Sequence, residues 1–177
     1  MPPEWNIYYW RWIIEDGQPD LRVGEQFDWF ALDFWTTRGL AKIDDRSGVA
    51  IAVNDYKYKV VAELVYLSEK SCVIDFGLRA VGPAGDIPPG CKQGDFVAGE
   101  ISIGIPLCTD VLPEEVSKTL AHKWEVNRIS ADLTPYITQP ISPRFFFRDE
   151  SQIRYDGIAS TDAVRAKGYV LHCTKIA

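Results

Sequence analysis

The 177-residue sequence has few of the residues on which common catalytic and metal sites depend. It holds two His and four Cys, and no two Cys form a CxxC pair, so the usual spacing of a structural zinc site is absent. No GxSxG, GxxxxGK[ST] or GxGxxG motif occurs, which removes the signatures of α/β-hydrolases and phosphate-binding loops. We therefore expect no metal and no cofactor, and we favour a non-catalytic protein.

The sequence also lacks the segments that direct a chain into or across a membrane. No apolar run approaches the length of a membrane span, and the first residues, MPPEWNIYYW, do not resemble a signal peptide. These absences predict a cytoplasmic protein with no disulfide framework, in which Cys72 and Cys108 are small core residues.

Positive charge is scarce as well. The net charge is −6 and the sequence pI is about 4.9, whereas nucleic-acid binders usually carry a basic patch that neutralises phosphates. The charge therefore disfavours nucleic acid as a partner and favours docking to a basic protein.

Aromatic residues are abundant, and five of the six Trp lie within the first 35 positions. Residues 5–14 and 26–36 both read as strands that are apolar on two faces, a pattern typical of strands covered on both sides. We assign about half of these rings to a core and the remainder to an interface. The Trp residues considered for binding are Trp10, Trp12, Trp29 and Trp35.

Alternation with a period of two continues through most of the chain. Residues 57–67 and 72–80 predict a hairpin, with one apolar and one polar face and a turn at Ser68 to Ser71. Further strands are expected at 48–53, 96–107, 123–133, 143–148 and 168–174. One short helix is expected near 111–122, with Asp110 as its cap.

This count predicts a mainly β protein, either all-β or a β-dominated α+β domain. The arrangement would be a curled antiparallel sheet or an OB-like barrel or sandwich. The stretch GDFVAGEISI resembles a barrel strand of the OB class. We expect a single domain over residues 1–177, with a possible subdivision into 1–108 and 109–177.

A few polar residues are candidates for chemistry or binding. Asp28 and Asp33 sit among large apolar side chains, as a glycosidase-like pair or a cation site would, although five residues apart on one strand they point to opposite faces. His172 and Cys173 are neighbours on a predicted strand, so they face opposite ways and cannot act as a pair. The segment PRFFFR adds candidate binding residues, namely Arg144, Phe146 and Arg148.

Three hypotheses follow from these observations. The first is a non-catalytic interaction protein of the immunity, inhibitor or accessory type, which docks a protein partner or associates with itself. The second is an OB-like nucleic-acid-binding module in which Trp and Tyr stack bases and cations bind phosphates. Its cations would be Lys57, Lys59, Arg79, Arg144 and Arg148. The third is a small-molecule enzyme with an acidic pocket built around Asp28, Asp33 or His172.

Overall fold

The computed structural model describes residues 4–29, 31–105, 112–139 and 142–176. This part of the chain is dominated by β-structure, with 53% strand and 8% helix, and it contains two short α-helices. The strands of this part of the chain are β1 (Trp5–Trp10), β2 (Gln26–Trp29), β3 (Leu32–Trp35), β4 (Ala41–Ile43), β5 (Val49–Asn54), β6 (Lys57–Leu67), β7 (Ser71–Asp75), β8 (Arg79–Pro83), β9 (Phe96–Gly104), β10 (His122–Asp132), β11 (Tyr136–Gln139), β12 (Ser142–Arg148), β13 (Tyr155–Ile158) and β14 (Gly168–Ile176). The helices are α1 (Arg11–Glu15), α2 (Glu114–Ser117) and the 3-10 turn η1 (Ala84–Asp86).

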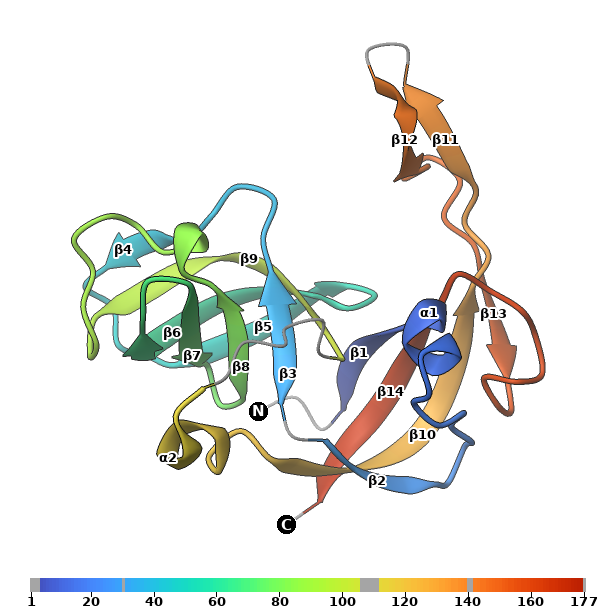
Figure 1. Cartoon of the computed structure of the whole chain (residues 1–177), viewed down its shortest axis with the longest axis horizontal. Coiled ribbons are helices and arrows are strands. Elements are labelled where there is room, and N and C mark those ends of the chain that lie inside the picture. Colours follow the sequence, from blue (N-terminus) through green and yellow to red (C-terminus); the bar gives the residue numbers. More distant parts are fainter. Residues whose placement is uncertain (1–3, 30, 106–111, 140–141, 177) are drawn as a thin grey trace.

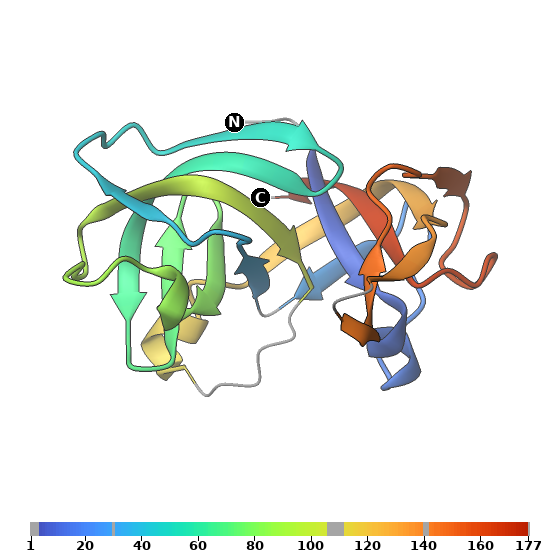
Figure 2. The ribbon, with the colours of Figure 1, turned by 90° about the horizontal axis from the view of Figure 1, so that it is seen from above.

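Five strands close into a barrel. Around the ring the order is β9, β3, β8, β7 and β6, and β6 pairs again with β9 to complete the closure. β3 runs parallel to β8, and the other neighbours in the ring are antiparallel. β5 extends the sheet beyond β6, and β4 pairs with β9 (Figures 1 and 2). The expected β-dominated barrel with a short helix is therefore confirmed.

A second group of strands continues the same sheet on the far side of β1. β1 pairs in parallel with β9, where Tyr8 lies opposite Gly104, and it pairs antiparallel with β14 along its whole length. β14 also pairs with β10, and β2 and β13 each pair with part of β10 (Figure 1). Strands from the first 30 residues are thus neighbours of the last ones. The division of the chain into one domain or two stays a prediction.

Alternation along the strands fills the interior as the pattern predicts. On β6, the side chains of Tyr58, Val60, Ala62 and Leu64 are buried, while the intervening Lys59 is exposed. On β1, one face carries Trp5, Ile7 and Tyr9, which belong to the main core together with residues of β10 and β14. The apolar faces of both strand groups therefore meet in one continuous core.

The expected strand over residues 5–14 is wrong in its second half, which forms helix α1. β1 ends at Trp10, and the chain then makes a helical turn that closes where the N–H of Gln18 donates to the carbonyl of Ile13 at 3.1 Å. Ile13 packs into the main core from this turn. Aromatic and β-branched residues favour a strand locally, but packing against the rest of the molecule decides the conformation here.

The expected strand over residues 26–36 is two strands in different parts of the molecule. β2 pairs with β10, whereas β3 is a strand of the barrel and lies between β8 and β9. An apolar run with no turn residues gives no local sign that the chain passes from one group of strands to the other. The prediction of one continuous strand is therefore wrong.

The expected return strand over residues 72–80 is also divided. β7 and β8 are joined by a tight turn, in which Gly77 has a φ of +93° and its N–H donates to Oδ1 of Asp75 at 3.0 Å. Glycine reaches this left-handed region without the penalty of a Cβ, and Asp stabilises such turns with its side chain. Gly77 was the local signal of the turn, and the alternation on either side of it concealed the break.

The expected helix near 111–122 exists but is much shorter. α2 spans four residues, and β10 already begins at His122. The hydroxyl of Thr119 donates to the carbonyl of Val116 at 2.7 Å. This side-chain hydrogen bond competes with the backbone hydrogen bonds that would continue the helix. Asp110, the expected cap, lies outside the described residues.

β11 and β12 form a two-stranded sheet of their own. This hairpin, which we call the arm, projects from the body of the protein in Figure 1. An isolated two-stranded hairpin is only marginally stable in water, so the contacts at the foot of the arm are important. They are made by residues at its two ends, Tyr136 and Arg148.

Two further observations bear on the environment of the protein. Among the described residues, no helix combines the length and the apolar content needed to cross a bilayer. Cys72, Cys91 and Cys173 are free thiols, and burial raises the pKa of Cys72 to about 12. The expectation that Cys72 is a core residue is confirmed, and Cys108 lies outside the described residues.

Candidate functional site

The structure brings two of the expected binding residues together, Trp10 and Trp35. Their ring centroids lie 6.3 Å apart, and both rings belong to a cluster with Tyr8 and Tyr56. Tyr8 and Trp10 are close edge-to-face neighbours, with centroids 4.5 Å apart. The second face of the N-terminal strand thus packs largely within the molecule, against the hairpin that joins β5 to β6.

The two carboxylates expected to mark a pocket lie on different strands. Asp28 is exposed on β2, and Asp33 is buried on β3, a strand of the barrel. Because β2 and β3 belong to different strand groups, the two residues do not form a pair at one site. The side chains of Trp29, Arg144 and Phe146 lie outside the part of the structure that is described.

Arg148 occupies an internal site at the foot of the arm. Its Nε donates to Oδ2 of Asp132 at 3.1 Å, and the exposed fractions of the two side chains are only 10% and 1%. The hydroxyl of Tyr8 donates to the same carboxylate oxygen at 3.1 Å, and the N–H of Thr134 donates to the other at 3.1 Å. This network fixes the end of β12 to the end of β10 and to β1.

Tyrosines complete the surroundings of this ion pair. A guanidinium nitrogen of Arg148 donates to the hydroxyl of Tyr155 at 2.5 Å. Burial, with the charge of Asp132 added, raises the pKa of Tyr155, and burial raises the pKa of Tyr56 to about 12. These phenols stay neutral at physiological pH. The network is therefore a fixed anchor for the arm and leaves Arg148 unsuited to the surface phosphate contact that the nucleic-acid hypothesis gave it.

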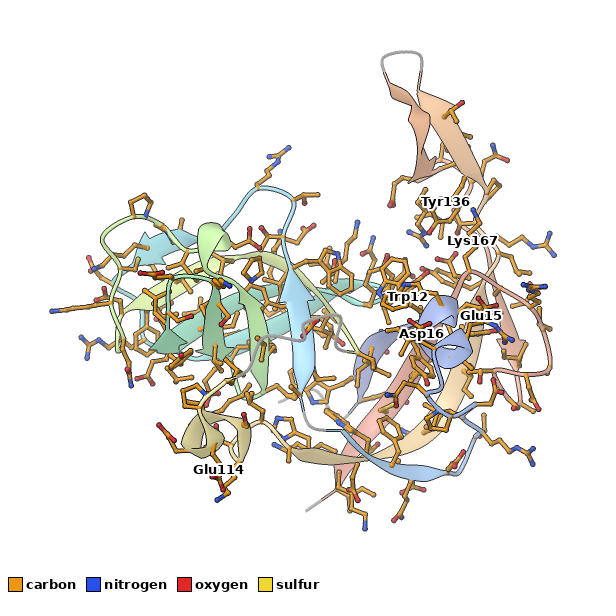
Figure 3. All side chains as sticks on the ribbon, in the orientation of Figure 1. Trp12, Glu15, Asp16, Glu114, Tyr136 and Lys167 are labelled. Atoms are coloured by element: carbon orange, nitrogen blue, oxygen red, sulfur yellow. The ribbon has the colours of Figure 1, made fainter. Side chains whose placement is uncertain are left out.

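A groove of about 380 Å³ lies between α1 and the foot of the arm. Figure 3 shows Trp12 and Glu15 on α1, facing Tyr136 and Lys167. Trp12 is 46% exposed, which is high for the largest apolar side chain, and Trp10 lines the inner part of the groove. The Lys167 ammonium sits 3.8 Å from the centroid of the Tyr136 ring, so this aromatic wall carries a cation on its face.

The charged residues of the groove are mainly basic. Arg11 and Arg165 both reach Oε1 of Glu15, each at 3.4 Å, so this one carboxylate is shared by two guanidinium groups. With Lys167, three cations and one carboxylate line the groove. Asp20 lies 4.0 Å from Arg11 at its margin. The lining is thus locally positive in a protein whose net charge is −6.

One buried polar atom lies next to the groove. In the described part of the chain, Nε1 of Trp10 is buried and has no hydrogen-bond acceptor. Unsatisfied buried donors are uncommon in folded proteins. Because the atom is itself shielded from solvent, as is the equally unpaired Nε1 of Trp124 in the core, the groove does not present it to a partner.

His172 lies in a polar row across three neighbouring strands. Its Nε2 is 3.1 Å from Oγ of Ser130 on β10, and its Nδ1 is 2.8 Å from Oδ1 of Asn6 on β1. With the proton on Nδ1, the histidine donates to Asn6 and accepts from Ser130. A guanidinium nitrogen of Arg128 also lies 3.1 Å from Nδ1. Burial and, to a smaller extent, the positive charge of Arg128 lower the pKa of His172.

Cys173 faces the opposite side of β14 and is fully buried in the core. The expectation that His172 and Cys173 point to opposite faces is therefore confirmed. Both residues are buried, since His172 is only 8% exposed.

The residues that build the groove come from segments far apart in the sequence. Arg11, Tyr136 and Lys167 carry no shared motif, and only the pairing of β1 with β14 and the position of the arm bring them together. Sequence reasoning identified Trp10 and Trp12 through their aromatic density. It missed the cations, since isolated Arg and Lys residues are ordinary surface residues.

A second hollow of about 650 Å³ lies beside α2. Its lining mixes apolar residues such as Val116 with the charged residues Glu63, Arg79 and Glu115. Arg79 is also held by Asp75, with a 2.9 Å distance from Nε to Oδ2. The residues that lead into α2 are outside the described part of the chain, so the groove beside α1 is the better-defined candidate site.

Comparisons of the chain with protein-family models, with curated proteins and with solved structures found no match. The function is therefore inferred from the geometry of the candidate site.

Proposed function

We propose that the protein is a non-catalytic interaction protein that binds an extended segment of a protein partner in the groove between α1 and the arm. The observation that carries the proposal is the half-exposed Trp12 facing the Tyr136–Lys167 pair across a groove of about 380 Å³. Exposed Trp and Tyr beside cations are the composition of binding hot spots, because they bury large areas at a small entropic cost.

The charges of the groove define the segment that it would bind. Charges further apart than about 8 Å are largely screened at physiological ionic strength, so the lining counts for more than the net charge of the protein. Three cations surround one carboxylate there, which favours a segment with an acidic residue beside an apolar one. This replaces the basic partner that the overall composition favours.

The arm supports the same proposal. It is a two-stranded sheet that pairs with no other strand in the described residues, and the buried Arg148–Asp132 pair holds its foot rigidly beside the groove. A bound segment that contacts both the groove and the arm would stabilise the hairpin. We place this function in the cytoplasm, a proposal that fits the free thiols of Cys72, Cys91 and Cys173.

The test is a selection of random linear peptides on the immobilised protein, followed by titration of labelled synthetic peptides. We expect enriched sequences that carry an acidic residue next to an apolar one. Trp12→Ala and Lys167→Glu should each weaken binding at least about tenfold. The matched controls are Ile153→Ala and Lys59→Glu, which change an exposed apolar residue and an exposed cation away from the groove. No enrichment, or peptides that bind the groove variants as tightly as the wild type, would refute the proposal.

One observation favours a second candidate, a hydrolase. Ser130, His172 and Asn6 have the order of nucleophile, base and orienting group that acyl transfer uses. Arg128 competes for the same histidine nitrogen, which weakens this arrangement as a triad. A fluorophosphonate probe that labels the wild type but not Ser130→Ala would support hydrolysis. Equal labelling of both proteins, or none, would leave the row as a structural hydrogen-bond network.

A further inference from the structure

Strand β5 forms an edge of the barrel sheet. It pairs with β6, and no other strand of the described chain pairs with its outer side (Figure 2). The outer edge of such a strand presents unpaired N–H and C=O groups, which readily accept a further strand. Natural edges are usually protected by Lys, Pro or an inward-pointing charge, and residues 49–53 contain none of these.

The side chains of β5 are unusually apolar for an exposed edge. Val49, Ile51 and Val53 are 36%, 61% and 44% exposed, and they are three of the seven large hydrophobic residues found exposed in the described chain. Only Ala50 and Ala52 separate them. Apolar residues gathered in this way on one short strand are typical of an interaction surface.

The order of these residues identifies the partner. The segment Val-Ala-Ile-Ala-Val, residues 49–53, reads the same in both directions. In an antiparallel pair centred on Ile51, Val49 of one copy lies opposite Val53 of the other, and Ile51 lies opposite itself. A two-fold interface requires such self-complementarity, because the same patch serves both subunits. We propose that β5 pairs with β5 of a second copy of this chain to form a closed dimer.

The charges beside the strand allow this pairing. Lys59 is the neighbour of Ile51 on β6, so each copy carries a cation on the same face. Three strand spacings separate Lys59 from its counterpart in the other copy, a distance of about 14 Å that exceeds the Debye length. Two six-residue strands bury less area than a standard protein interface, so we expect a dimer that dissociates at micromolar concentrations.

The experiment is sedimentation velocity of the full chain between about 5 and 500 μM, where the expected interface should be partly dissociated at the lower end. The wild type should shift from the 20.0 kDa monomer towards a dimer and no further, because a two-fold interface closes at two copies. Ile51→Lys and Ile51→Glu should each remain monomeric, since like charges would face each other on the axis. A 1:1 mixture of these two variants should regain the dimer.

Ile153→Lys is the matched control, because Ile153 is 40% exposed and lies outside β5; it should dimerise like the wild type. The inference is overturned if the wild type stays monomeric or grows beyond a dimer. It is also overturned if Ile51→Lys dimerises normally, if the mixture fails to reassociate, or if Ile153→Lys behaves like Ile51→Lys. The groove residues take no part in this interface, so the result is independent of the proposed peptide binding.

Discussion

Replacing Arg148 by Met should destabilise the protein strongly, because it leaves the Asp132 carboxylate without its cation. Asp132 is 1% exposed and would keep only the hydrogen bonds from Tyr8 and Thr134. Breaking a buried ion pair from one side costs about 3–5 kcal/mol. The lost contact with Glu150 adds little, since that carboxylate is largely exposed.

The expected loss is a large share of the total stability, which for natural domains is about 5–15 kcal/mol. For a chain of this size it lowers the melting temperature by about 6–20 °C. Guanidinium unfolding, followed by Trp fluorescence, measures the change in the free energy of unfolding. The matched control is Arg154→Met, which removes an exposed ion pair with Asp156 and should cost less than about 1 kcal/mol.

A second substitution separates charge from packing. Asn at position 132 keeps an acceptor oxygen for the N–H of Thr134, its amide NH2 can donate to the Tyr8 hydroxyl, and it carries no charge. The double variant, Arg148→Met with Asp132→Asn, should therefore recover more than half of the stability lost in Arg148→Met alone. If Arg148→Met costs no more than Arg154→Met, or if the second change recovers nothing, the buried pair does not anchor the arm.

Three further predictions concern the body of the protein. Gly168→Ala places a Cβ in steric conflict with the ring and hydroxyl of Tyr8 and should cost about 1–3 kcal/mol of unfolding free energy, measured by thermal denaturation. Gly157→Ala meets no atom within 4 Å and should cost far less. Burial and, to a smaller extent, the positive charge of Lys175 lower the pKa of His122 to about 4. Between pH 6.5 and 4, the unfolded chain therefore binds a proton at His122 that the folded chain does not bind. As the pH is lowered through this window, the free energy of unfolding should decrease by at most about 1.4 kcal/mol per pH unit. A His122→Gln variant with the same pH dependence of stability as the wild type would contradict this. The buried thiol of Cys72 should not react with a disulfide reagent at pH 7 unless the chain is unfolded, and rapid modification of the native protein at this position would show that the barrel opens.

The fold class was predictable because alternation is a direct consequence of a sheet with one buried face. The pattern of β6 assigned its core residues correctly from Tyr58 to Leu64. The structure of segments with apolar residues on both faces was predicted wrongly. Such a segment fits a strand, a buried helix or a crossing between strand groups equally well. Residues 5–14 and 26–36 are the two examples, and each changes structure where no turn residue marks the change.

The candidate site was predictable only in part. Trp10 and Trp12 stood out through composition, but the Asp132–Arg148 pair and the Tyr136–Lys167 contact join residues 16 and 31 positions apart in a way that no local pattern encodes. The position of β5 at the edge of the sheet could not be predicted either, because the residues of an apolar strand do not indicate which strands pair with it. The self-complementary order of residues 49–53 gains its meaning once that strand is known to be an edge.

The most direct measurement of the proposed function is a titration of the ¹⁵N-labelled protein with a selected peptide, followed through the indole N–H resonances of its Trp residues. If the groove is the binding site, the indole signals of Trp12 and Trp10 should shift together as the peptide is added. The signals of Trp5 and Trp124, which are buried in the core, should stay in place. Shifts at Trp5 or Trp124 with no change at Trp12 would show that the peptide binds elsewhere and would contradict the account.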